Sequence, residues 1–142
     1  MDATIIFPNN LFENKKNLDK NSKIFIFQDP LFFNDLKYHV KFNKKKILMH
    51  LMSTEDYLNN LKSLGYNAEL VPFYDLKGSN YVEEFIEKNN IKILNIYEII
   101  DFELKKRFIS ASNNLNVSVN WLNNPMFLLN SDEVKNEFQG KK

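Results

Sequence analysis

The chain has 142 residues, of which 44% are hydrophobic and thirteen are Phe, a composition that indicates one folded domain and excludes a disordered chain. Its nineteen basic and eighteen acidic residues leave a formal charge of +1, which excludes the domain-wide positive field that draws in a polyanion such as DNA. The lack of cysteine excludes disulfides, thiolate metal sites and a cysteine nucleophile. The start of the chain has no signal-peptide pattern, and no apolar run is long enough to span a membrane. Together with the lack of cysteine, these features favour a cytoplasmic protein.

Five short runs rich in β-branched and aromatic residues predict strands. They cover Thr4–Phe7, Lys23–Phe27, Ala68–Phe73, Ile91–Ile96 and Val117–Leu122. The second and fourth runs are apolar almost throughout, as expected for strands of a parallel sheet that is covered on both faces. Helices should therefore lie between the strands.

Three stretches between these runs carry apolar residues at helical spacing. The longest runs from about Phe42 to Leu64 and is followed by Gly65, which stands where a C-terminal cap belongs. Its apolar stripe consists of Leu48, Leu51, Met52, Leu58 and Leu61. A shorter helix is predicted after a Ser79 cap, with Val82, Phe85 and Ile86 as its apolar residues.

Another helix is predicted to begin at Asp101, and its apolar stripe consists of Leu104, Phe108, Ala111 and Leu115. The connection from Pro8 to Ser22 is polar and should be a loop with one short turn, and a last short helix is expected from Ser131 to Phe138. This order of elements predicts an α/β fold. We expect a five-stranded, mostly parallel, doubly wound (Rossmann-like) sheet with helices on both faces, formed by residues 1–142 as a single domain.

Most familiar catalytic and cofactor motifs are missing. The only glycines are Gly65, Gly78 and Gly140, so neither a P-loop nor a G-x-G-x-x-G fingerprint is present. The two histidines, His39 and His50, are eleven residues apart without the spacing of a metal site, and a structural or interface role is the better interpretation. No carboxylate forms a recognisable acid/base pair or completes a hydrolase triad.

A dense basic cluster, Lys41, Lys44, Lys45 and Lys46, lies at the start of the longest predicted helix. Such a cluster can contact the phosphates of a nucleic acid or of a phosphorylated cofactor. The interpretation that we favour is that these lysines are exposed to solvent at the beginning of the helix and bind no ligand.

The most unusual segment is Asp29–His39, which follows the second strand and is too aromatic for an ordinary surface loop. In open parallel sheets the carboxyl ends of the strands form the ligand crevice, so this loop should meet the Pro8–Leu11 turn and the end of the fourth strand there. The candidate ligand contacts are Asn9, Asn10, Leu11, Asp29, Pro30, Phe32 and Tyr97. The equally supported alternative is that Phe32 and Phe33 close the end of the sheet or an inter-domain surface.

The segment from Asp29 to His50 resembles the opening half of the deoxyribodipyrimidine photolyase-related family, which comprises the iron–sulfur bacterial cryptochromes and the prokaryotic six-four photolyases. Pro8–Leu11 looks like the turn that follows the first strand in that family, and Asn124–Leu128 looks like the family's sequence motif after the fifth strand. The chain departs from the family pattern at Asn43–Lys46 and at Leu51-Met52.

Relatives continue into a long helical domain that binds FAD, carries an iron–sulfur cluster and receives the DNA lesion, and these 142 residues contain none of it. The resemblance implies that this α/β domain packs on such a helical half, in the same or a separate chain, and holds an antenna pigment, a lumazine in characterised relatives. It implies no catalytic residue here, no FAD, iron–sulfur cluster or metal in this chain, and DNA contact only through the helical half. The surface that meets that half should be apolar, exposed and prone to self-association.

Two functions from different classes therefore remain. One is the amino-terminal domain of a cryptochrome or photolyase-related flavoprotein, a lyase family, in light-driven DNA repair or blue-light sensing. The other is a stand-alone Rossmann-like ligand-binding or protein-interaction module without enzymatic activity. A bound pigment would favour the first.

Overall fold

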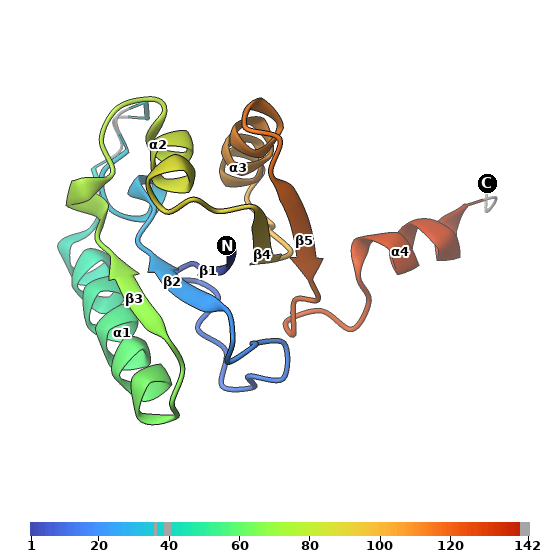
Figure 1. Cartoon of the computed structure of the whole chain (residues 1–142), viewed down its shortest axis with the longest axis horizontal. Coiled ribbons are helices and arrows are strands. Elements are labelled where there is room, and N and C mark those ends of the chain that lie inside the picture. The colour runs from blue at the N-terminus through green and yellow to red at the C-terminus, as the bar shows by residue number, and fades with distance from the viewer. Residues whose placement is uncertain (36, 39–40, 140–142) are drawn as a thin grey trace.

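The computed structural model describes residues 1–35, 37–38 and 41–139 and contains one all-parallel sheet (Figure 1). Its strands lie in the order β3-β2-β1-β4-β5. They are β1 (Asp2–Ile6), β2 (Lys23–Phe27), β3 (Ala68–Val71), β4 (Ile93–Tyr97) and β5 (Ser118–Leu122). This architecture confirms the predicted α/β, Rossmann-like fold, and all five strands lie within two residues of their predicted ends.

The first strand is the centre of the sheet. Ile5 lies opposite Phe25 of β2 on one side and opposite Ile96 of β4 on the other. Because side chains alternate along a strand, Ala3, Ile5 and Phe7 point to one face of the sheet and Ile6 points to the other.

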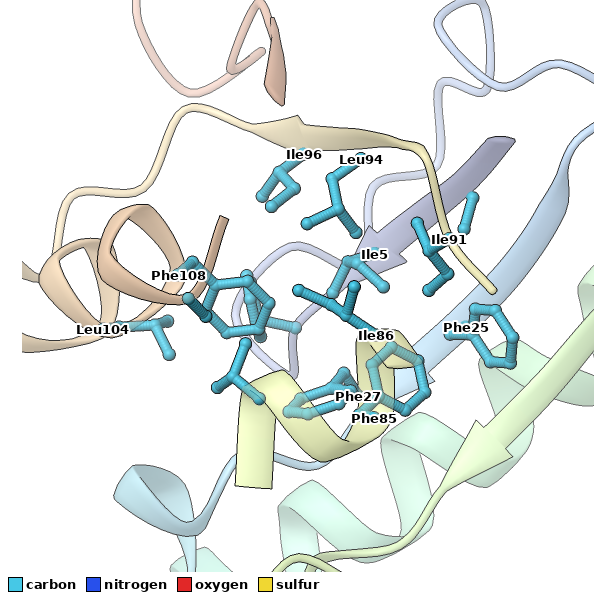
Figure 2. Packing of buried hydrophobic residues seen from close by; sticks show 14 of the residues in the cluster. Ile5, Phe25, Phe27, Phe85, Ile86, Ile91, Leu94, Ile96, Leu104 and Phe108 are labelled. Atoms are coloured by element: carbon cyan, nitrogen blue, oxygen red, sulfur yellow. The ribbon is translucent and has the colours of Figure 1, made fainter. Parts of the chain in front are cut away.

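One face is covered by α2 (Tyr81–Lys88) and α3 (Phe102–Asn114), which enclose the larger hydrophobic core (Figure 2). Phe7, Phe27 and Phe108 form its centre, with edge-to-face ring contacts at centroid distances of 5.2 Å for Phe7–Phe108 and 5.6 Å for Phe27–Phe108. Such aromatic pairs add about 0.5–1.5 kcal/mol each beyond the area that they bury. The predicted stripe of α3 is confirmed, since Leu104, Phe108 and Ala111 are fully buried.

The opposite face is covered by α1 (Lys44–Ser63) and by the loop of residues 8–22, in which no helix forms. The inward face of α1 was predicted only in part. Leu61 is buried, but the other buried residues of this helix are His50, Thr54 and Tyr57. Leu48 and Met52 are exposed, because they lie on the opposite side of the helix from the residues that contact the sheet.

Local signals set the helix ends. Asn43 caps α1 by accepting a hydrogen bond from the N–H of Lys45, and Asp101 caps α3 in the same way with Leu104. At the other end of α1, the N–H groups of Gly65 and Tyr66 donate to the carbonyls of Lys62 and Leu61, a Schellman arrangement that requires the positive φ of 82° at Gly65.

The predicted Ser79 cap of α2 is wrong. The capping position belongs to Asn80, and the Ser79 hydroxyl lies 3.2 Å from the Asn80 side-chain oxygen instead. Two short 3-10 turns, Pro30–Phe32 and Phe73–Asp75, follow β2 and β3. The last helix, α4 (Ser131–Phe138), has its predicted bounds and stands away from the sheet (Figure 1). None of the helices that the structure describes has the length and hydropathy needed to cross a bilayer.

Candidate functional site

The carboxyl ends of all five strands lie along one edge of the sheet, as parallel strands require. The structure places the candidate ligand residues from the sequence in two groups at this edge. Asp29 and Pro30 are buried, and Phe32 packs against the core under α2 and α3. Leu11 and Tyr97 belong to the core under α1. Asn10 is buried and Asn9 is exposed.

A hydrogen-bonded network surrounds the carboxylate of Asp29, which is fully buried. The hydroxyl of Tyr81 donates to its Oδ2 at 2.7 Å, and the N–H of Leu31 donates to its Oδ1 at 3.0 Å. Burial is the main cause that raises the pKa of Asp29 to about 6, although both hydrogen bonds and the charge of Arg107 act against it. A carboxyl group with this pKa changes its protonation state within the range of mildly acidic buffers.

Arg107 joins this network to the loop after β2. Its Nη1 and Nη2 donate to the two carboxylate oxygens of Asp35 at 2.7 and 3.2 Å, and Nη1 also lies 3.3 Å from the Tyr81 hydroxyl. Burial raises the pKa of Asp35, but the hydrogen bonds and charge of Arg107, together with the N–H groups of Tyr38 and Lys37, hold it below its ordinary value. A second ion pair connects Lys37 to Glu103 at 2.9 Å, and Nε of Arg107 contacts the same Glu103 oxygen at 3.4 Å.

A cavity of about 460 Å³ opens beside this network, within the usual size range of small-molecule sites. It is lined by Pro30, Asp35, Lys37, Leu76, Gly78, Ser79, Tyr81, Glu103 and Arg107. Its apolar wall comes from three different loops or helices, and the charged groups are those that the network already holds in place. The lining therefore offers both apolar and charged contacts to a small molecule.

The candidate ligand contacts predicted from the sequence do not include Tyr81, Arg107 or Asp35. One signal was available, because Arg107 is the single arginine among nineteen basic residues. A guanidinium binds a carboxylate with two parallel hydrogen bonds, which a lysine cannot do, so a lone arginine in a lysine-rich chain marks a position where that geometry matters.

Aromatic rings pack at the same edge beside α1. Phe33 is buried and stacks on Phe73 with a centroid distance of 4.7 Å and an interplanar angle of 4°. Phe32 and Phe33 both contact the ring of His50, which is buried and whose two nitrogens have no hydrogen-bond partner among the described residues. Burial, followed by the charge of Lys46, lowers the pKa of His50. His39 lies outside the described residues.

Tyr97 lies under the loop of residues 8–22, with its ring edge-to-face against Phe12 at 5.0 Å. Its hydroxyl is buried and has no hydrogen-bond partner in the part of the chain that the structure describes. By contrast, the hydroxyl of its neighbour Tyr57 donates to the carbonyl of Phe12 at 2.9 Å. Within the described residues, no group of three His, Asp or Glu side chains is arranged to hold a metal ion.

A third feature is an apolar groove between the start of α3 and the carboxyl-terminal segment. Its volume is about 580 Å³, and its apolar lining consists of Ile99, Ile100, Phe102, Phe127, Leu129 and Val134. Phe102 is 79% exposed although it is a large aromatic residue, and Leu128 beside the groove is fully exposed. Exposed apolar side chains gathered in one place are a common feature of interaction surfaces.

Comparison with known proteins assigns the chain to a family. A family model described as deoxyribodipyrimidine photo-lyase-related protein matches residues 4–142. The uncharacterized protein R852 of Acanthamoeba polyphaga mimivirus is 29% identical over 146 aligned residues, which cover 99% of this chain and 72% of that protein. The matched region includes both groups of candidate residues and the groove. Because the family model matches nearly the whole chain, the chain belongs to the deoxyribodipyrimidine photo-lyase-related protein family.

Proposed function

We propose that this chain is the amino-terminal α/β half of a cryptochrome or photolyase-related flavoprotein. In this proposal it packs against a helical FAD-binding half, in the same or a separate chain, and serves light-driven DNA repair or blue-light sensing. The FAD, the iron–sulfur cluster and the DNA contacts belong to the helical half. The observation that carries the proposal is the exposed apolar groove around Phe102. A domain that functions alone rarely exposes contiguous apolar surface, whereas a domain that packs on a partner does.

The groove suggests a direct test of the partnership. The intact chain and a separately purified helical half of a photolyase-related flavoprotein would be mixed and analysed by size-exclusion chromatography with flavin absorbance. We expect co-elution, and we expect Phe102→Glu to abolish it because a charge would enter the apolar contact. Tyr74→Glu, a matched change at an exposed aromatic residue of the 3-10 turn after β3, should leave co-elution intact. Separate elution of the unmodified proteins would contradict the proposal.

The second part of the proposal is that the cavity beside Pro30 and Tyr81 holds an antenna pigment of the lumazine type. Arg107 supports this, because four of its five N–H groups are used by Asp35, Tyr81 and Glu103, which leaves one Nη2 hydrogen without a partner among the described residues. That hydrogen is available to a carbonyl oxygen of the pigment, a hydrogen bond worth on the order of 1 kcal/mol.

Titration of the chain with a ribityllumazine, followed by fluorescence, tests the cavity. We expect saturable binding that is lost in Ser79→Trp, because the indole would occupy the cavity from its exposed edge. Ser63→Trp, at an exposed position of α1, is the matched control and should bind normally. Phe32→Ala is informative as well, because Phe32 was a candidate ligand contact. Weaker binding with an unchanged melting temperature would place the pigment against Phe32 instead.

The alternative function is a stand-alone Rossmann-like module without enzymatic activity. One observation favours it: Phe33 is buried, stacks on Phe73 and contacts the ring of His50, so aromatic packing fills this part of the carboxyl edge beside α1. Absence of both lumazine binding and flavoprotein binding, in a chain that unfolds cooperatively, would favour this alternative.

A further inference from the structure

The outward side of α1 carries a regular pattern of exposed residues that the core does not explain. Leu48 is 55% exposed and Met52 is 63% exposed, on the side of the helix opposite to the residues that contact the sheet. Figure 1 shows α1 along the border of the molecule. Two large apolar side chains one helical turn apart therefore face water.

These residues belong to a stripe with alternating spacings of three and four. The stripe runs through Lys45, Leu48, Met52, Glu55 and Asn59, all of which are exposed. This 3-4 spacing is the pattern that pairs helices side by side in coiled coils, where the apolar positions of one helix contact those of the next.

Charges of like sign are grouped along α1. Within α1, Lys44, Lys45 and Lys46 form the first turn, Glu55 and Asp56 lie near the middle, and Lys62 lies in the last turn. Lysines in the first turn of a helix are disfavoured by the helix dipole, so Lys44 and Lys45 gain nothing from their own helix. No salt bridge within the described residues involves Lys44, Lys45, Glu55 or Asp56.

The pattern is complementary to itself when reversed. If two α1 helices lie antiparallel and cross near residue 50, Lys45 faces Glu55 of the partner subunit, Leu48 faces Met52 of the partner subunit, and Lys44 faces Asp56 of the partner subunit. A shallow hollow of about 480 Å³ on the same face is lined by Met52, Ser53, Glu55, Asp56 and Asn59. Four of these, at positions 52, 55, 56 and 59, have the spacing of a hole that accepts one side chain of a facing helix.

We propose that α1 pairs with α1 of a second copy of this chain in a two-fold symmetric, antiparallel dimer. In this arrangement Leu48 and Met52 form the apolar centre, and the lysine end of each helix lies over the acidic hollow of the other. Two-fold dimers require a surface that matches itself, and reversed charge order around an apolar centre meets that requirement. Antiparallel alignment also brings opposite ends of the two helix dipoles together.

The dimer should be weak and concentration-dependent. Each copy contributes only two large apolar side chains, Leu48 and Met52, to the centre of the contact, and a standard stable interface buries ~800 Å² per partner. We therefore expect a dissociation constant of roughly 0.1 mM. The apolar groove around Phe102 is a different surface, so this inference does not depend on the proposed function.

Sedimentation equilibrium of the intact chain, from about 10 µM to about 1 mM, tests the dimer. Lys45→Glu and Glu55→Lys each place like charges opposite one another at both symmetric contacts, and each should weaken association roughly 10-fold. The double variant Lys45→Glu/Glu55→Lys restores opposite charges and should restore association. Lys62→Glu makes the same charge change on α1 away from the contact and should leave the dissociation constant unchanged.

Two further variants separate this face from the groove. Met52→Lys should abolish dimer formation, whereas Phe102→Lys should not change it. Circular dichroism of every variant checks that the fold is retained. A chain that stays monomeric at the highest concentration overturns the proposal. Failure of the double charge swap to restore association, or loss of the dimer in Phe102→Lys alone, overturns it equally.

Discussion

The two sides of the sheet's carboxyl edge differ in whether their buried polar groups have hydrogen-bond partners. On the α2–α3 side, Asp29, Tyr81 and Arg107 hydrogen-bond to one another or to Asp35, and a cavity lies beside them. On the α1 side, His50 and Tyr97 are buried without hydrogen-bond partners among the described residues, and aromatic rings pack against them. The hydrogen-bonded polar network borders an open cavity, whereas on the other side aromatic rings pack around the polar groups.

The largest expected effect is on the aromatic side. Phe33→Ala should lower the free energy of unfolding by about 3–5 kcal/mol, because the ring is buried and stacked on Phe73. Phe32→Ala should cost less, because Phe32 is only partly buried. Urea denaturation measures both. A loss below about 1 kcal/mol for Phe33→Ala would mean that this aromatic cluster is not closely packed.

On the network side, Arg107→Met should lower the free energy of unfolding by about 3 kcal/mol, because the buried carboxylate of Asp35 loses its partner. Arg107→Lys should fall between Met and the native residue, since an ammonium keeps the charge but not the two parallel hydrogen bonds. Unfolding by guanidinium chloride, followed at low protein concentration, measures the free energy of unfolding of each variant. Equal stability of the Met and Lys variants would show that only the paired geometry matters and the charge does not.

Asp29 gives the network a characteristic pH dependence. Its pKa is about 6 in the folded chain against 3.8 as the ordinary value, so the folded state holds a proton that the unfolded state releases. This group's contribution to stability should therefore be lost as pH rises from about 4 to about 6, by an amount on the order of 2–3 kcal/mol.

Asp29→Asn isolates the Asp29 contribution from that of the other carboxyl groups. The difference in unfolding free energy between the variant and the native chain should favour the variant increasingly as pH rises to about 6 and then level off. Thermal melts in matched buffers across this range provide the comparison. A difference that stays constant with pH would show that Asp29 titrates normally and that its burial has little effect.

The smallest effect concerns two tyrosines on the α1 side. Tyr97→Phe removes a buried hydroxyl without a described partner and should be neutral or stabilising by up to about 1 kcal/mol. Tyr57→Phe removes a hydroxyl that donates to the carbonyl of Phe12 and should be destabilising by about 1 kcal/mol. Opposite signs for the same chemical change would show that a buried hydroxyl on this side stabilises the fold only when it has a hydrogen-bond partner. A clear loss of stability in Tyr97→Phe would show that its hydroxyl has a partner in solution.

The strands were predictable from sequence because a doubly covered parallel strand is an apolar run with few alternatives. Lys23–Phe27 matches its predicted bounds for this reason. The inward face of α1 was not predictable to the same degree. Leu48 and Met52 share a helical stripe, and periodicity shows that a stripe exists without showing which side of the helix meets the sheet. The residues of α1 that pack in the core include Thr54 and Tyr57. Because both are polar, a pattern of apolar spacing does not reveal them.

The candidate site was predictable only in outline. Topology indicates the carboxyl edge of the sheet, and Asp29 and Pro30 lie beside the cavity as residues that follow β2. Arg107 and Tyr81 come from helices more than 50 residues later in the chain. Their convergence on Asp29 depends on how α2 and α3 are placed across the sheet, which no local pattern in the sequence encodes.

The central position of β1 has a consequence for the order in which the chain can fold during synthesis. The pairing of β1 with β2 joins residues about 20 apart, but its pairing with β4 joins Asp2 to Ile93. The β3-β2-β1 half and α1 can form as soon as residue 71 has left the ribosome, whereas β1 keeps one unpaired edge until β4 follows. Closure of this long-range pair is therefore expected to limit the folding rate, and the nascent chain is most open to misassembly between the emergence of β3 and that of β4.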